Sequence, residues 1–235
     1  GIPDENEILK NGDIINVDVS TIYKGFYSDA SRMFTIGNVS PERQRLVDVA
    51  RECLEAGLAA VHPWGFLGDV GAAVQEHAEA NGYSVVTKFG GHGCGVEFHE
   101  EPFVAHVGKR GTGCLLVPGM TFTIEPMINA GTSDLFIDEK NGWTAYTIDG
   151  KDSAQWEHFI LVTEDSFENL SVDAKSGNMM LSSIKVSDTI ESKRAYGNFI
   201  MEDVSCRALI DASDNGDVKF DNLTSDYIDL KSKNG

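Results

Sequence analysis

Basic residues are scarce in this sequence, since 19 Lys and Arg stand against 37 Asp and Glu and give a formal net charge of −18. Such a chain is poorly suited to sequence-independent binding of nucleic acid or anionic lipid, because both need clustered positive charge. The sequence also lacks any apolar run of the ~18 residues that a membrane-spanning helix needs. We therefore expect neither nucleic acid nor membrane as a partner.

Cysteine is also rare, and no Cys-x-x-Cys pair occurs among Cys53, Cys94, Cys114 and Cys206. This density is far below that of a disulfide-stapled scaffold, so a reducing cytoplasm is the expected compartment. No secretory signal is visible. The chain opens at Gly1 without an initiator Met, and we interpret this start as a fragment boundary.

Two regions differ in composition. Residues 1–170 hold 26 acids and 11 bases, together with every His, Trp and Pro of the chain. Residues 171–235 are rich in Ser, Asp, Asn and Lys, with short alternating apolar stretches at 180–186 and 218–223. No internal repeat of fixed period is apparent by eye. We predict a domain at 1–170 and a small extension, β-rich or disordered, at 171–235.

The first region has the pattern of an α+β domain. Residues 14–23 and 26–35 are β-branched and aromatic runs around Lys24-Gly25, which predicts a hairpin. Apolar residues at helical spacing predict a helix from Ser40-Pro41 to Pro63 and another over about 69–81, ended by Gly82. The rest is predicted to be strand and loop: 83–88, a Gly-rich stretch at 90–95, 120–128 and 154–163.

The hairpin is the first candidate site. A two-residue loop at Lys24-Gly25 makes Asp18 and Asp29 diagonal neighbours on one face, ~7–8 Å apart, close enough to share one cation. The other face, with Val17, Val19, Ala30 and Phe34, is expected to pack into a core. The alternative is a solvated face on which the two acids meet by accident.

Three further candidates are weak when taken singly. His92 lies in a Gly-rich stretch, with His99 seven residues on, and a lone His is more often structural than a ligand. Glu125 and Glu157 each interrupt an apolar strand pattern, where a buried carboxylate needs a partner. A structural salt bridge is the alternative for either Glu, although few bases are available.

Together, Asp18, Asp29, His92, Glu125 and Glu157 form a hard, oxygen-rich ligand set that suits Mn, Fe, Co or Zn. Four negative charges balance two divalent ions, and two ions ~3.5–4 Å apart can share a bridging water or hydroxide that is nucleophilic at neutral pH. His99 is then a candidate donor to the substrate carbonyl or the developing oxyanion.

The chain resembles type I methionine aminopeptidase, of the aminopeptidase/creatinase/prolidase superfamily, over Gly1 to about Leu170. The resemblance rests on linked motifs in the family's order and spacing: Asn16-Val17-Asp18-Val19, Ser28-Asp29-Ala30-Ser31-Arg32-Met33-Phe34, Gly91-His92-Gly93, Phe98-His99-Glu100-Glu101-Pro102, Phe122-Thr123-Ile124-Glu125-Pro126-Met127 and Ser153-Ala154-Gln155-Trp156-Glu157-His158.

This resemblance implies the pita-bread fold, an antiparallel sheet with flanking helices, and removal of the initiator Met before a small second residue. The family's metal ligands fall on the five residues above, the substrate-binding His falls on His99, and Glu125 is also the acid/base. Phe98 and Trp143 match positions that line the methionine pocket. The implied partners are peptide and nascent-protein N-termini, and we expect a monomer.

The start of the chain departs from the family, in which a second functional His directly precedes Gly-Ile-Pro. That His and the N-terminal part of the fold are missing here, so we expect the chain as printed to be weakly active or unstable. Two alternatives stay open: a Xaa-Pro peptidase of the same superfamily, and a non-catalytic peptide-binding remnant. The extension has no assigned role, and recruitment to the ribosome is one hypothesis for it.

Overall fold

The computed structural model describes residues 8–170, 179–182, 185–194, 199–213 and 218–232. Contacts divide the chain into two compact units, Gly1–Ser171 and Val172–Gly235, each of which is described by itself. Among the described residues, the first unit combines two α-helices with short strands, and the second contains strands alone. No helix in these residues is long and apolar enough to cross a membrane.

The predicted hairpin is confirmed, with its register. Strands β1 (Ile14–Tyr23) and β2 (Phe26–Thr35) are antiparallel, and Asp18 faces Ser31 while Ser20 faces Asp29. Lys24 and Gly25 both have positive φ, 53° and 89°. A two-residue loop with positive φ at both positions matches the right-handed twist of the flanking strands, which explains the tight turn.

The expectation that Val17, Val19 and Phe34 pack into a core is wrong. Their exposed fractions are 43%, 54% and 48%, and Ala30 on the same face is half-buried. The other face, with Asp29, Ser31 and Met33, is the buried one. The reason is that Met33 belongs to the core formed with the first helix, so the alternation of side chains turns Val17 and Val19 away from it.

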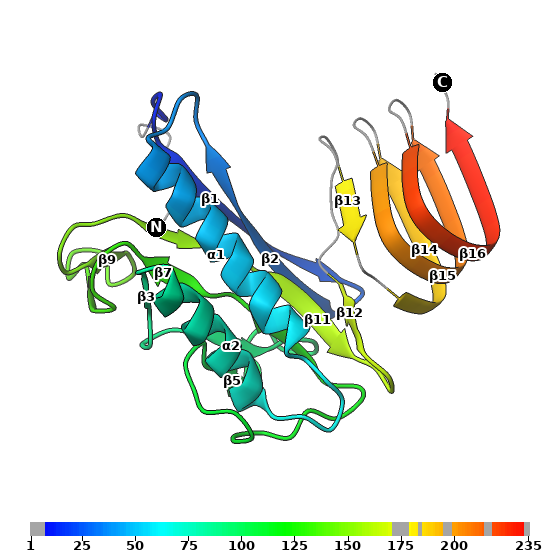
Figure 1. Cartoon of the computed structure of the whole chain (residues 1–235), viewed down its shortest axis with the longest axis horizontal. Coiled ribbons are helices and arrows are strands. Elements are labelled where there is room, and N and C mark those ends of the chain that lie inside the picture. Colours follow the sequence, from blue (N-terminus) through cyan, green and yellow to red (C-terminus); the bar gives the residue numbers. More distant parts are fainter. Residues whose placement is uncertain (1–7, 171–178, 183–184, 195–198, 214–217, 233–235) are drawn as a thin grey trace. The chain divides into compact units, whose positions relative to one another are not determined.

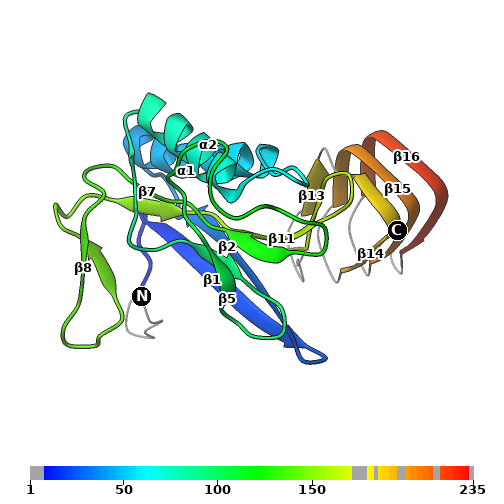
Figure 2. The same cartoon turned by 90° about the horizontal axis from the view of Figure 1, so that it is seen from below.

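Both predicted helices are present. Helix α1 (Pro41–Ala59) begins after Ser40, whose Oγ accepts a hydrogen bond from the Arg43 backbone N–H at 3.3 Å. Helix α2 (Leu67–Ala80) begins two residues before the predicted start, and Asn81 and Gly82 end it. Figure 2 shows both helices on one face of the strands, where their apolar stripes bury two clusters of core side chains.

The strands of this unit form antiparallel sheets behind the helices (Figure 1). A five-stranded sheet has the order β12-β11-β6-β4-β5, a three-stranded sheet the order β10-β7-β3, and β8 pairs with β9. Their bounds are β3 (Ser84–Val85), β4 (Gly91–Gly93), β5 (Glu100–Val104), β6 (Thr121–Ile124), β7 (Met127–Asn129), β8 (Leu135–Ile137), β9 (Ala145–Thr147), β10 (Ser153–Gln155), β11 (His158–Val162) and β12 (Phe167–Asn169).

Two of the predicted strands are each broken in two. The stretch 120–128 divides into β6 and β7 at Glu125-Pro126, and the stretch 154–163 divides into β10 and β11 at Trp156-Glu157. Because β6 pairs with β11 and β7 pairs with β10, the two breaks lie side by side. Two acidic residues thus leave the strand ladder at the same place in the fold.

The second unit is a stack of parallel strands: β13 (Met179–Ser182), β14 (Lys185–Arg194), β15 (Phe199–Ser213) and β16 (Val218–Ser232), the last three curved in Figure 1. Phe199 faces Val218 and Ser213 faces Ser232, a constant offset of 19 residues. Met179 of β13 and Lys185 of β14 instead pair with β15 at an offset of 20 residues, so the pairing does not establish one fixed period in the sequence. Residues 171–178 and 183–184 of the predicted extension lie outside the described residues.

Candidate metal centre

The two hairpin acids converge, as their register predicts. Asp29 is 5% exposed, and its Oδ1 accepts a hydrogen bond from Ser20 Oγ at 3.0 Å. Asp18 is the more exposed of the two, but loss of water around its carboxyl raises its pKa to about 6. The negative charge of Asp29 and a hydrogen bond between the two carboxyl groups contribute to this rise in the pKa. The alternative of a solvated hairpin face, on which the two acids meet by accident, is therefore not supported.

His92, in β4, points one ring nitrogen at the acids. Its Nδ1 lies 2.9 Å from the Gly93 carbonyl oxygen, and a carbonyl can only accept, so Nδ1 carries a proton and Nε2 is the ligand atom of the neutral ring. Nε2 lies 3.7 Å from both Asp29 Oδ2 and Glu125 Oε1. Burial lowers the pKa of His92, but its bonds to Asp29 and Gly93 outweigh this effect and raise the pKa.

Glu125 occupies the break between β6 and β7 and is 8% exposed. Its Oε1 accepts a hydrogen bond from Thr123 Oγ1 at 3.0 Å, and its Oε2 accepts one from Gln155 Nε2 at 3.0 Å. These two bonds set the direction of the carboxyl group. Burial raises the pKa of Glu125 to about 7.

Glu157 occupies the neighbouring break and is 2% exposed. Its backbone N–H donates to the Ser31 carbonyl at 3.1 Å, which ties this break to the hairpin. Burial and then the charges of Glu125, Asp29 and Asp18 raise the pKa of Glu157 to about 10. Ligand atoms of Asp29, His92 and Glu157 all lie within 4.8 Å of one another.

This donor set fits a divalent metal. Glu125 and Glu157 are buried acids, and in the part of the chain that the structure describes neither forms an ion pair with Lys or Arg. The negative charge of Asp29 raises the pKa values of Asp18, Glu125 and Glu157, so the ionised cluster needs a compensating cation. Carboxylates with one imidazole suit Mn, Fe, Co or Zn. The alternative that Glu125 and Glu157 are partners in structural salt bridges with Lys or Arg therefore does not explain their burial.

Comparisons with known proteins agree with this geometry. The model of metallopeptidase family M24 matches residues 1–164. The chain is 54% identical to methionine aminopeptidase A of Synechocystis sp. over 172 residues, which cover 73% of this chain and 68% of the relative. It is 47% identical to methionine aminopeptidase of Escherichia coli K12 over 172 residues, covering 73% and 65%. The chain belongs to metallopeptidase family M24.

A solved structure gives the same assignment for the fold. Methionine aminopeptidase from Rickettsia prowazekii matches with a TM-score of 0.70 and 45% identity, covering 72% of this chain and 68% of that one. The predicted family and pita-bread fold are therefore confirmed, and the metallopeptidase family implies a divalent metal. The chain spans about two thirds of the length of these curated relatives. A second family model, Toastrack DUF4097, matches residues 129–235.

His99 of the M24 unit lies beside the candidate ligands. Its ring centroid is 4.3 Å from that of His92 and 4.2 Å from that of Phe98, and the residue is exposed. Partial burial and the charge of His92 lower the pKa of His99, which favours its neutral ring. Phe98 also contacts Tyr27, with ring centroids 5.6 Å apart. These aromatic rings form one wall beside the ligand cluster.

Trp143 is placed differently from the other predicted site residues. It lies between β8 and β9, and 69% of its surface is exposed. Within the described ranges, no ring contact joins it to Phe98 or His99. Its role as a pocket residue of this M24 unit stays a prediction.

Sequence reasoning missed the residues that orient the ligands. Thr123 and Gln155 bond the Glu125 carboxylate, and Asn16 Nδ2 donates to the Gln155 carbonyl at 2.8 Å. A signal for two of them was available. Thr123 and Gln155 each lie two residues before a candidate ligand, and side chains two apart in a strand share a face.

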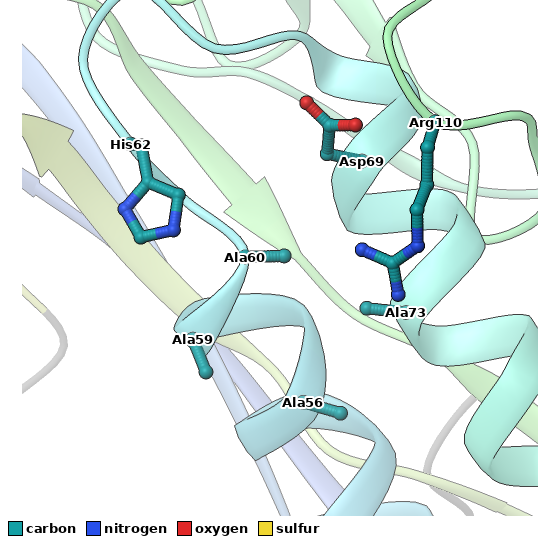
Figure 3. A pocket seen from close by; sticks show the side chains of 7 residues that line it. All are labelled: Ala56, Ala59, Ala60, His62, Asp69, Ala73 and Arg110. Carbon is teal, nitrogen blue, oxygen red and sulfur yellow. The ribbon is translucent and has the colours of Figure 1, made fainter.

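The described residues also form an open hollow of about 290 Å³ (Figure 3). It lies between the end of α1 and the first half of α2, and Asp69, His62 and Arg110 surround a floor of alanines. The Arg110 guanidinium is already paired with Glu76, at 2.7 Å. None of the candidate ligands lines this hollow, so it is separate from the metal centre.

Proposed function

We propose that the M24 unit, residues 1–170, is a metal-dependent aminopeptidase that removes the N-terminal methionine of peptides and nascent proteins with a small second residue. One observation supports this most strongly: three buried carboxyl groups, the more exposed Asp18 and one imidazole lie together in a chain that is 54% identical to a methionine aminopeptidase. The predicted extension, residues 171–235, has no part in the reaction in this proposal.

Asp18, Asp29, His92, Glu125 and Glu157 hold two divalent ions in this proposal, drawn from Mn, Fe, Co and Zn. The contacts among these residues support the assignment, because each of them approaches or electrostatically perturbs another member of the set. When bound, the ions supply a nucleophilic water at neutral pH. Four carboxylate charges balance two divalent cations, which removes the cost of burying them.

The protein's own groups divide the remaining work. Glu125 takes a proton onto its carboxylate and returns it to the leaving amine, a role that suits a carboxyl whose pKa lies near 7 in the metal-free protein. His99 donates a ring N–H to the substrate carbonyl from the edge of the cluster. Phe98 and Trp143 bind the methionine side chain.

The reaction is tested by release of Met from Met-Ala-Ser with added Mn(II), using the chain as printed. We expect release that a chelator abolishes and that Asp18→Ala strongly reduces, because the variant lacks one ligand. Preferential cleavage of Ala-Pro peptides would instead favour a Xaa-Pro peptidase. Metal-dependent peptide binding without any product would favour a binding protein, a reading compatible with a chain that spans 68% of its relative.

His99→Ala separates substrate binding from metal binding. We expect unchanged metal stoichiometry and a loss of turnover of roughly 100-fold, the usual contribution of one oxyanion donor. The ring of His99 lies beside that of His92, with centroids 4.3 Å apart, at the edge of the cluster. Loss of a metal ion in this variant would reassign His99 as a ligand.

The cytoplasm is the proposed compartment, because Cys53, Cys94 and Cys114 are all free.

The second unit is proposed to recruit the enzyme to the ribosome. Deletion of residues 171–235 should then reduce co-sedimentation with ribosomes, and an unchanged pellet would remove this hypothesis.

A further inference from the structure

The break between β6 and β7 leaves Glu125 without a strand partner. The last pair of the β6–β11 ladder joins Ile124 to His158, and β7 resumes only at Met127. Pro126 has no backbone N–H, so the N–H of Glu125 is the sole main-chain donor within the break. Its partner therefore has a large influence on where this backbone lies.

That partner is a buried side chain. His106 is 1% exposed, and its Nε2 accepts the Glu125 backbone N–H at 3.0 Å. An imidazole nitrogen accepts only when it is unprotonated, so the proton of the neutral ring lies on Nδ1. His106 follows β5, whose neighbour β4 carries His92. The ring thus replaces the missing strand partner from the loop that follows β5.

We propose that His106 is a positioning residue, which holds the Glu125 backbone so that its carboxylate meets the metal site. The inference rests on the proposed ligand role of Glu125. Thr123 and Gln155 orient the carboxylate itself, at 3.0 Å each, and His106 anchors the main chain from which that carboxylate extends. Removing the ring acceptor leaves a buried N–H unsatisfied and lets Glu125 move away from His92.

Two substitutions separate this role from simple packing. His106→Leu keeps a bulky apolar group but has no acceptor, whereas His106→Gln has an amide oxygen close to the position of Nε2. Val49→Ala is the matched control, because Val49 is fully buried in the helix core and is not part of the metal centre. All variants are compared in the full chain, at a temperature where thermal melting shows each one to be folded.

The first readout is the affinity for Co(II), measured by calorimetry together with the visible spectrum of the bound ion. We expect affinity in His106→Leu to fall about tenfold, as is typical for outer groups that orient ligands, with an altered spectrum. We expect His106→Gln to stay within about threefold of the original chain and Val49→Ala to lose thermal stability alone. Turnover of Met-Ala-Ser in His106→Leu should fall in kcat with little change in KM.

Equal Co(II) affinities in the original chain and in His106→Leu would overturn the proposal, as would an equal loss in the Leu and Gln variants. A chain that takes up no Co(II) at all would also overturn it. A chain that binds Co(II) with the expected ranking but releases no Met would leave the positioning role standing and refute the proposed peptidase activity. The two failures are thereby distinguished.

Discussion

Glu157 shows how the buried metal ligands lower the stability of the metal-free protein. It is 2% exposed, and its pKa is raised to about 10, mainly by burial. The pKa of Glu125 is raised from 4.5 to about 7 for the same reason. Between pH 4.5 and about 7 the folded chain therefore holds more protons than the unfolded chain, so the free energy of unfolding falls as pH rises.

We predict that the metal-free chain loses on the order of 3 kcal/mol of stability through Glu125 alone as pH rises from about 5 to about 8, at 1.36 kcal/mol per pKa unit. Urea unfolding in EDTA at the two pH values measures this loss. Saturating Mn(II) should reverse the slope, because metal binding needs deprotonated ligands. Glu157→Gln, which removes a buried ionisable group, should flatten the dependence in EDTA, and an unchanged slope would contradict this explanation.

At the scale of elements, the contact between β4 and β6 decides where His92 lies. A Cβ at Gly91 would overlap the Thr123 carbonyl oxygen, so only glycine permits this spacing of the strands. The same Thr123 accepts the His92 backbone N–H through Oγ1, at 3.0 Å. Close packing of the two strands thus brings the imidazole toward the carboxylates of the neighbouring elements.

We predict that Gly91→Ala lowers stability by about 2 kcal/mol, as overpacking does, and weakens Co(II) binding by at least about tenfold. Gly95→Ala is the control on the same Gly-rich stretch, because its Cβ would meet its nearest atom at 3.5 Å, an ordinary contact. Chemical denaturation and Co(II) titration of both variants measure the difference. If the two variants behaved alike, strand spacing would not be what positions His92.

At the scale of the whole molecule, the chain consists of two units with separate internal contacts. Every candidate ligand and every hydrogen bond described for the metal centre belongs to residues 1–171. We predict that a chain lacking residues 172–235 keeps its Co(II) affinity within about twofold, measured by the same titration. A tenfold loss would show that the second unit contributes to the site.

In the second unit, β15 and β16 pair at an offset of 19 residues, whereas β13 pairs with β15 at an offset of 20. Apolar residues recur at the paired positions of β15 and β16, such as Met201 with Phe220 and Leu209 with Ile228. Glycines recur at 177, 197, 216 and 235, close to the spacing of the paired strands. Backbone hydrogen bonds join the parallel strands, and any residue except Pro can donate them. The amino acids along each strand can therefore vary while the pairing is kept.

The sequence alone determined the local features of this protein. Lys24-Gly25 specified the hairpin and its register, Ser40-Pro41 the start of α1, and the linked motifs the M24 family. Such features depend on neighbouring residues: turn geometry, capping and spacing along the chain. For this reason they could be predicted without knowing what surrounds them.

Only the tertiary structure decided which faces of the strands are buried and which residues orient the metal ligands. The alternation in β1 and β2 offered two faces, and packing of α1 against Met33 chose the one that carries Asp29. His106 lies 19 residues from Glu125 and meets it only because β6 ends where it does. Burial and long-range hydrogen bonds arise from elements brought together in space, which local patterns in a sequence do not encode.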